Sequence, residues 1–281
     1  MIRTLQFVII LLICLPWNMA VAEEPLFFGV LNQRSAIITA QYWNPILSYV
    51  SARSGVPLLL KMGRTAPETT AMTVRGEFAF AYTNHLFTPQ RDRLGWRVIA
   101  RPAGNGIQGA IVVPESSPVK TLAELAGTEV GFPSPEAFVG YWVPMDALLK
   151  AGVKVKPVFA GNQEGVMGQL KAGRIAAAAV NAQVMDGYAR REQFAYRTLW
   201  HSESYLNLAI MAHPKVSSDK AEAVKDALVK MAQDEEGRKI LQAGAELLKS
   251  SEALGFVAAD DKEYDNYRHF YRNTLLPLVN E

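Results

Sequence analysis

Cysteine is nearly absent from this sequence. The 281 residues contain a single one, Cys14, and it lies in an N-terminal segment that we expect to be removed. The mature chain would then hold no thiol nucleophile, disulfide, Cys-ligated metal or iron–sulfur centre. Histidine is also scarce, and no two histidines stand at ligand spacing, so we predict no metal site and interpret each as an ordinary surface or edge residue. They are His85, His201, His213 and His269.

Motifs for catalysis are missing as well. The chain has no G-x-S-x-G elbow, no G-x-x-x-x-G-K-[ST] phosphate loop and no H-E-x-x-H helix. The acidic residues that could matter form no recognisable acid–base pair; these are Glu68, Glu77, Glu136 and Glu164. We therefore predict that the protein is not an enzyme, has no catalytic residues and needs no cofactor.

Charge of one sign is not in excess. Lys and Arg number 29 against 27 Asp and Glu, which gives a formal net charge of +2, and no basic run stands out. This argues against a nucleic-acid partner. Apolar residues make up 49% of the chain, which is ordinary globular usage for one large domain or two small ones.

The N-terminus has the pattern of a secretory signal peptide. Arg3 precedes the apolar stretch Leu5–Pro16, and small residues follow at Ala20 and Ala22. We predict cleavage after residue 22 and a periplasmic mature protein. A membrane anchor is the alternative, but the run is short for a span of about 20 residues. Lipidation at Cys14 is disfavoured because the residue before it is a bulky isoleucine.

Apolar runs and helical periodicities alternate along the rest of the chain, which predicts an α/β fold with parallel sheets. The expected strands are 26–31, 56–62, 78–82, 110–113, 129–132, 155–159, 175–180 and 206–211. The expected helices are 37–54, 67–75, 121–127, 134–150, 166–172, 218–234, 236–249 and 261–273. We predict two lobes with a central sheet in each and a hinge between them: lobe I from 23–105 plus 205–281, and lobe II from 106–204.

Polar residues recur directly after the expected strands, at the sheet edge where ligands bind in open α/β folds. Two lobes that present such loops to each other would enclose a small molecule. The candidates are Asn32, Gln33, Arg34, Arg64, Thr65, Tyr82, Thr83, Asn84, Ser134–Phe138, Asn181 and Gln183.

Seven segments, in this order and spacing, resemble the periplasmic phosphate/phosphite/phosphonate-binding proteins of ABC transporters. They are FFGVL at 27–31, YWNPILSYVSARSGVPLLL at 42–60, RGEFAFAYTNHLF at 75–87, IVVPESSPVKTLAELAGTEVGF at 111–132, GYWVPMDALLKAGV at 140–153, VFAGNQEGVMGQLKAGRIAAAAV at 158–180 and GFVAADDKEYDNYRHFY at 255–271. The resemblance implies a type II periplasmic binding fold and ligand capture between the lobes.

Two departures from the family pattern concern the ligand. Family members carry a Ser-Thr-Ser-like run before the glycine that matches Gly140, and its hydroxyls and helix N-terminus bind the phosphorus oxyanion. Here that run reads Ala137-Phe138-Val139, preceded by the carboxylate of Glu136. After the third strand, Asn84 and His85 stand where the family has Gly and Pro. We therefore expect the scaffold without the family's phosphonate chemistry.

We expect eight residues to bind the ligand: Arg34, Tyr82, Thr83, Asn84, Ser134, Phe138, Asn181 and Gln183. A carboxylate on the ligand would pair with Arg34, although Arg64 is a second candidate and Arg34 could instead lie on the rim. A stacking surface for the ligand could come from Phe138, Tyr141, Trp142 and Tyr82. Alternatively, Phe138 and Trp142, four residues apart on one helix, simply pack into the core of the lobe.

Two partners are compatible with this reading. In the first, a monomeric receptor delivers its ligand to an inner-membrane ABC permease. In the second, the same fold presents its closed form to a membrane histidine kinase and acts as a signalling adaptor. Both use closure around a ligand, so the sequence does not separate them.

Overall fold

The computed structural model describes residues 24–250 and 255–278. The expected signal peptide, with Cys14 and the cleavage site, lies outside the described residues. Within the described ranges, no helix is both long enough and apolar enough to span a bilayer.

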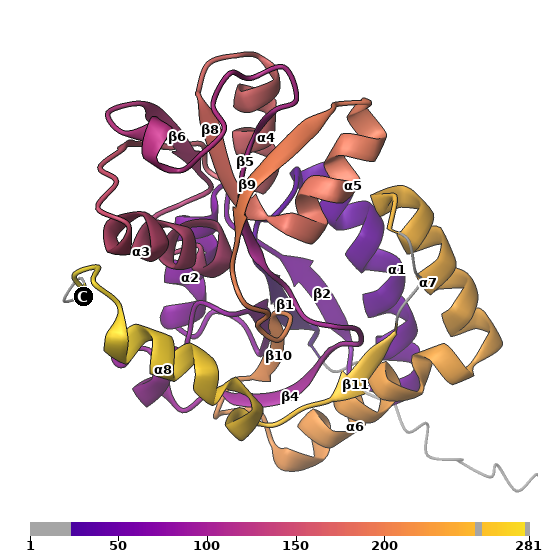
Figure 1. Ribbon diagram of the computed structural model, residues 1–281. Coiled ribbons are helices and arrows are strands. Elements are labelled where there is room, and N and C mark those ends of the chain that lie inside the picture. Colours follow the sequence, from indigo (N-terminus) through magenta and orange to yellow (C-terminus); the bar gives the residue numbers. More distant parts are fainter. Residues whose placement is uncertain (1–23, 251–254, 279–281) are drawn as a thin grey trace, which may run out of the picture.

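The first of two sheets is built from both ends of the chain (Figure 1). Its order is β11-β4-β10-β3-β1-β2. The strands β2, β1 and β3 run parallel, whereas β10, β4 and β11 add antiparallel pairs. The bounds are β1 Leu26–Val30, β2 Leu58–Lys61, β3 Phe80–Thr83, β4 Arg97–Pro102, β10 Ala209–Ala212 and β11 Phe256–Ala258. The sheet is therefore mixed, not parallel throughout as expected.

The second sheet takes its strands from the middle of the chain, in the order β7-β6-β8-β5-β9. The strands β7, β6 and β8 are parallel, and β5 pairs antiparallel with both β8 and β9. The bounds are β5 Gly109–Pro114, β6 Glu129–Phe132, β7 Lys156–Phe159, β8 Ala177–Asn181 and β9 Tyr196–His201. We call the part around the first sheet lobe I and the part around the second lobe II.

Helices cover the sheets, and several begin at N-caps of the residue types that favour this position. Ser35 caps α1, Thr65 caps α2 and Ser217 caps α6, each accepting from a backbone N–H three residues on. Gly55 ends α1 in the left-handed conformation. The bounds are α1 Ala36–Ser54, α2 Ala66–Val74, α3 Val143–Lys150, α4 Gln163–Lys171, α5 Ala182–Glu192, α6 Ser218–Lys230, α7 Glu235–Leu248 and α8 Asp265–Asn273. Short 3-10 turns occupy Asp92–Leu94, Ala123–Leu125, Met231–Gln233 and Asp261–Tyr264.

The helix expected from Ser134 to Lys150 begins later than predicted. Ala137 has an extended ψ of 115°, and the chain first forms a π-helical turn, Phe138–Trp142, in which the Trp142 N–H donates to the Ala137 carbonyl at 3.0 Å. Pro144 follows, and it has no N–H to donate to the carbonyl four residues before it. The missing N–H of Pro144 therefore goes with a wider, π-helical turn before it. Ser134 lies outside this turn and is not a helix cap.

Two extended segments, 103–108 and 202–208, connect the lobes and touch where they cross. Ile107 and Tyr205 form an isolated bridge with hydrogen bonds of 2.6 and 2.8 Å. Gly106 beside it has a φ of +87°, and a Cβ there would lie 2.2 Å from the Tyr205 carbonyl oxygen. Only glycine fits this crossing without displacement.

The C-terminal helix α8 contacts both lobes (Figure 1). Tyr267 lies 5.2 Å from the Phe87 ring of lobe I and 4.2 Å from the Phe138 ring of lobe II, centroid to centroid. Just beyond the helix, the Thr274 hydroxyl and the Leu275 N–H donate to the buried Asp146 of α3 at 2.9 and 2.7 Å. The predicted division at residues 105/106 and 204/205 remains a proposal about which parts move together.

Candidate functional site

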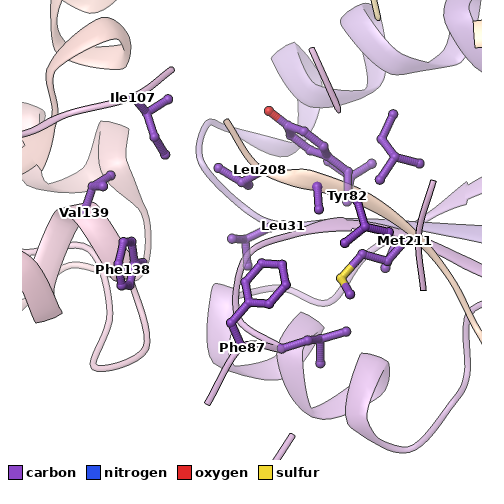
Figure 2. Packing of buried hydrophobic residues seen from close by; sticks show 14 of the residues in the cluster. Leu31, Tyr82, Phe87, Ile107, Phe138, Val139, Leu208 and Met211 are labelled. Carbon is purple, nitrogen blue, oxygen red and sulfur yellow. The ribbon is translucent and has the colours of Figure 1, made fainter. Parts of the chain in front are cut away.

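The carboxyl ends of the parallel strands face each other across the two lobes, and a small cavity of about 20 Å³ lies between them. We call it the first chamber. Its volume is that of about one water molecule. Its lining is Leu31, Asn32, Gln33, Ala66, Asn84, His85, Pro133, Ser134, Ala137, Phe138, Val139, Gly140, Gln163 and Leu208. Figure 2 shows Phe138 and Val139 on one side with Leu31, Phe87 and Leu208 opposite.

Polar groups of the first chamber are mostly occupied by the protein itself. Asn32 donates to the Gly63 carbonyl at 2.9 Å and accepts from the Thr69 hydroxyl at 2.5 Å. Gln163 accepts from the Asn181 N–H at 3.0 Å. Ser134 is 1% exposed, and its hydroxyl has no hydrogen-bond partner among the described residues. Because a buried unsatisfied hydroxyl is costly, Ser134 is the group most ready to bond a ligand.

His85 lies at the edge of this chamber, and the expectation that it is a surface residue is wrong. It is 2% exposed, and its Nδ1 lies 2.8 Å from the Thr70 hydroxyl. Burial, with the positive charge of Arg91 nearby, lowers the pKa of His85 to about 3. The imidazole is therefore neutral at ordinary pH, and the first chamber has no cation in its lining.

A second chamber of about 10 Å³ lies beside the first and shares Leu31 and Gln33 with it. The guanidinium of Arg34 belongs to its lining, together with the rings of Tyr42, Trp43 and Tyr82. The Tyr82 hydroxyl donates to the Asn207 amide oxygen at 3.2 Å, and its ring lies 4.8 Å from that of Trp43. A guanidinium between aromatic walls has the donors that an anionic group could accept from.

Arg34 makes no ion pair within residues 24–250 and 255–278. Glu164, an acid whose charge acts on it, is paired with Arg191 at 2.5 Å and also accepts from the Ser35 N–H at 2.9 Å. Burial lowers the pKa of the Arg34 guanidinium, an effect that Tyr82, Tyr42 and Glu164 oppose. Arg34 is thus a partly desolvated cation at the cleft, while Glu164 connects lobe II to the start of α1 in lobe I.

Arg64, the other candidate cation, points away from the chambers. Its side chain is 92% exposed and pairs with Glu68 of the next helical turn, with a nitrogen–oxygen distance of 3.3 Å. Such a pair is screened by solvent and contributes little to stability.

Phe138 occupies the position where the resemblance implies a hydroxyl. It is 1% exposed, and four aromatic rings surround it at centroid distances of 4.2 to 5.5 Å: Tyr205, Tyr267, Phe270 and Tyr271. Ala137 and Val139 are buried beside it. The start of this helix is therefore surrounded by apolar side chains. Most of the Phe138 surface is buried in the core, which favours the core-packing alternative over a stacking surface for a ligand.

The remaining expected site residues have structural partners. The Thr83 hydroxyl accepts from the His85 N–H at 3.1 Å. Asn181 caps α5, accepting from the Gln183 and Val184 N–H groups at 3.0 and 3.3 Å. The Gln183 amide donates to the Gly106 carbonyl at the crossing. None of these three lines either chamber, whereas Arg34, Tyr82, Asn84, Ser134 and Phe138 do.

Replacement of Asn181 with alanine tests this assignment. We expect a loss of about 1 kcal/mol in the free energy of unfolding, the usual contribution of an N-cap, with ligand affinity unchanged. Chemical denaturation and calorimetry measure the two quantities. A large loss of affinity at unchanged stability would return Asn181 to the binding site.

Sequence reasoning misses Gln163 and Glu164 at the cleft. The strand β7 ends at Phe159, and these residues come only after the Gly161 turn and the Asn162 cap. Choosing only the polar residues directly after a strand therefore leaves out Gln163 and Glu164. An N-cap Asn followed by two polar residues is the signal that could have found them, because a helix start at this sheet edge also faces the cleft.

Comparison with known proteins places this geometry in context. A family model described as "ABC transporter, phosphonate, periplasmic substrate-binding protein" matches residues 28–264. No curated protein is similar enough in sequence to count as a match.

Solved structures share the fold at low identity. PhnD1 from Prochlorococcus marinus, solved in complex with methylphosphonate, has a TM-score of 0.74 and 16% identity over 88% of this chain and 97% of its own. A binding protein component of an ABC phosphonate transporter from Pseudomonas aeruginosa has a TM-score of 0.75 and 17% identity over 88% and 86%. XAC2383 from Xanthomonas citri, bound to ATP, has a TM-score of 0.66 and 16% identity over 89% and 96%. The expected family and the type II periplasmic binding fold are confirmed.

Proposed function

The chain belongs to the family of periplasmic substrate-binding proteins of phosphonate ABC transporters, and from this premise we propose that it captures a small organic anion through Arg34. The two chambers together hold no more than about two water molecules, so the lobes must separate to admit the ligand. We propose that its anionic group then lies between Tyr42 and Tyr82 and that the rest extends past Gln33 toward Ser134. Proteins of this family deliver a small molecule to an ABC permease and are not enzymes.

The proposal depends on one observation, that Arg34 is a partly buried cation without an ion-pair partner among the described residues. Arg34 lies in the cleft lining, and its neighbouring acid Glu164 is already paired with Arg191. A carboxylate that forms two parallel hydrogen bonds to a guanidinium in such a place is strongly held.

The helix start of lobe II supports the proposal from the opposite side. Phe138 and Val139 offer no hydroxyl, and the Glu136 carboxylate lies beside this turn, 3.3 Å from Arg91. A phosphonate dianion in the first chamber would meet Phe138 and Val139 where the resemblance implies hydroxyl donors. We therefore expect phosphate, phosphite and simple alkylphosphonates to bind weakly or not at all.

Arg34→Ala, compared with Arg64→Ala, tests the proposed role. A thermal-shift screen of small carboxylates with the mature protein first identifies a ligand, which at a hundred times its Kd should stabilise by about 2.7 kcal/mol. Arg34→Ala should then raise the Kd at least about tenfold, or about 1.4 kcal/mol. The loss should persist in high salt because a desolvated pair is poorly screened.

The two variants separate a binding role from steering. Arg64→Ala should leave the Kd unchanged. An equal effect of both substitutions, or an Arg34 effect that vanishes in salt, would place Arg34 on the rim and refute the proposal.

A second candidate is an adaptor for a membrane histidine kinase, which would use the same closing contacts of the chain as a transport receptor. Lobe II reaches lobe I and α8 through its own side chains, in the Glu164–Ser35 hydrogen bond and the Phe138 cluster. In the adaptor role, the closed form held by these contacts would bind the kinase without releasing its ligand to a permease. Stimulation of a reconstituted permease ATPase by the liganded protein would favour transport, and stimulation of kinase autophosphorylation alone would favour the adaptor.

We also propose that the mature form is a periplasmic monomer that begins at or near Glu23. N-terminal sequencing of the protein from a periplasmic extract should find this start. Recovery of a form that retains Met1 in the membrane fraction would contradict it.

A further inference from the structure

A larger cavity of about 190 Å³ lies at the junction of the two lobes and α8, apart from both chambers. We call it the junction cavity. Its lining is Thr88, Gln90, Arg91, Pro135, Glu136, Trp142, Tyr271 and Leu278. Thr88, Gln90 and Arg91 come from the loop after β3 in lobe I, and Pro135, Glu136 and Trp142 come from lobe II. Neither chamber shares a lining residue with it.

The junction cavity has a buried floor and an accessible mouth. Arg91, Trp142 and Tyr271 are 6%, 8% and 2% exposed. The mouth residues Gln90 and Pro135 reach solvent. A molecule can therefore enter from solvent and rest on a rigid aromatic floor.

The shape and charge of this cavity select a class of ligand. Trp142 and Tyr271 meet edge to face, with centroids 5.3 Å apart, and form an aromatic corner. An apolar cavity of about 150 Å³ is enough for benzene, so the volume here suits one ring with a small substituent. The Arg91 and Glu136 charges lie 3.3 Å apart and offset each other, so the site gives no net attraction to an ion that must lose its hydration.

We propose that the junction cavity is a second ligand site, which takes a small uncharged aromatic compound and so ties lobe I, lobe II and α8 together. The ring lies against Trp142 and Tyr271, and its polar substituent bonds at the mouth, where Gln90 offers an amide. A ligand in this place binds the closed arrangement better than an open one and so acts as an effector of closure. The inference is independent of the anion that Arg34 is proposed to hold.

Three probes of one ring size test the class: benzamide, benzoate and benzylamine. Calorimetry with the mature protein should show saturable one-to-one binding of benzamide. Benzoate and benzylamine should bind at least about tenfold more weakly. Each must lose the hydration of its charge on entering the cavity, and the Arg91–Glu136 pair offers no net charge to compensate for that loss. Equal binding of all three, or no saturable binding of benzamide at millimolar concentrations, would overturn the proposal.

Substitutions at the mouth test the location. Gln90→Phe should fill the opening and weaken benzamide at least tenfold, whereas Gln242→Phe, the same change on an exposed turn of α7, should leave it unchanged. Arg34→Ala should also leave it unchanged, which separates this site from the chambers. If Gln90→Phe does not fold, Leu278→Ala, which removes one wall, should show the loss. Benzamide binding that neither Gln90→Phe nor Leu278→Ala alters would refute the assignment.

Discussion

Phe138→Ala is expected to lower the free energy of unfolding by about 3–5 kcal/mol, the range for deleting a fully buried phenylalanine. The ring lies in a cluster with Tyr205, Tyr267 and Tyr271 and is 1% exposed. Its removal leaves a cavity where lobe II meets α8, and the packed walls can close it only in part. Urea denaturation at pH 7 measures the loss.

Phe159→Ala provides the matched control for this effect. The same atoms are removed from a side chain that is 41% exposed, so less than half the loss is expected. Equal losses for the two variants would show that the Phe138 cluster contributes no special stability, and that the apolar helix start is not maintained by packing.

Acid should destabilise the protein through His85 by about 2 kcal/mol between pH 7 and pH 5. Burial beside Arg91 lowers the pKa of His85 to about 3 from an ordinary value of 6.5. Below pH 6.5 the His85 imidazole is protonated in the unfolded chain, whereas in the folded protein it stays neutral down to about pH 3. Each pH unit in this window therefore removes about 1.4 kcal/mol from the free energy of unfolding.

The comparison that isolates this contribution is His85→Gln, whose amide can still meet the Thr70 hydroxyl but does not titrate. The variant should lack this part of the pH dependence, so the stability difference between the two proteins shrinks or reverses as the pH falls. Identical pH profiles for wild type and His85→Gln would show that His85 titrates normally and is not held neutral by burial.

Local signals in the sequence predict most helices and the mostly buried strands correctly. The helix expected over 37–54 matches α1, which ends at the left-handed Gly55, because helical periodicity and left-handed glycine are local properties. Four elements, β4, β9, β11 and α5, are not among those expected from the sequence. Charged residues interrupt β4 and β9, which weakens their apolar pattern. In α5 the buried residues Val184, Met185 and Tyr188 do fall on one helical face, but polar residues surround them in the sequence. The structure of these elements comes from pairing and packing with distant segments.

The site shows the same division between local and distant causes. Strand ends bring Arg34, Tyr82, Asn84, Ser134 and Phe138 to the lining of the two chambers. Asn181 has the same strand-end position, but a helix begins at once and uses its side chain as a cap. That Phe138 packs on α8 depends on contacts across more than a hundred residues, which no local pattern encodes.

Calorimetric titration of the mature protein with methylphosphonate tests the central claim most directly. The claim is that this member of the phosphonate-binding family keeps the scaffold and has lost the oxyanion site, because Ala137, Phe138 and Val139 replace hydroxyls and Glu136 precedes them. We predict no saturable heat at millimolar methylphosphonate, with a small carboxylate bound by the same preparation in an Arg34-dependent manner. A submicromolar Kd for methylphosphonate would contradict the account.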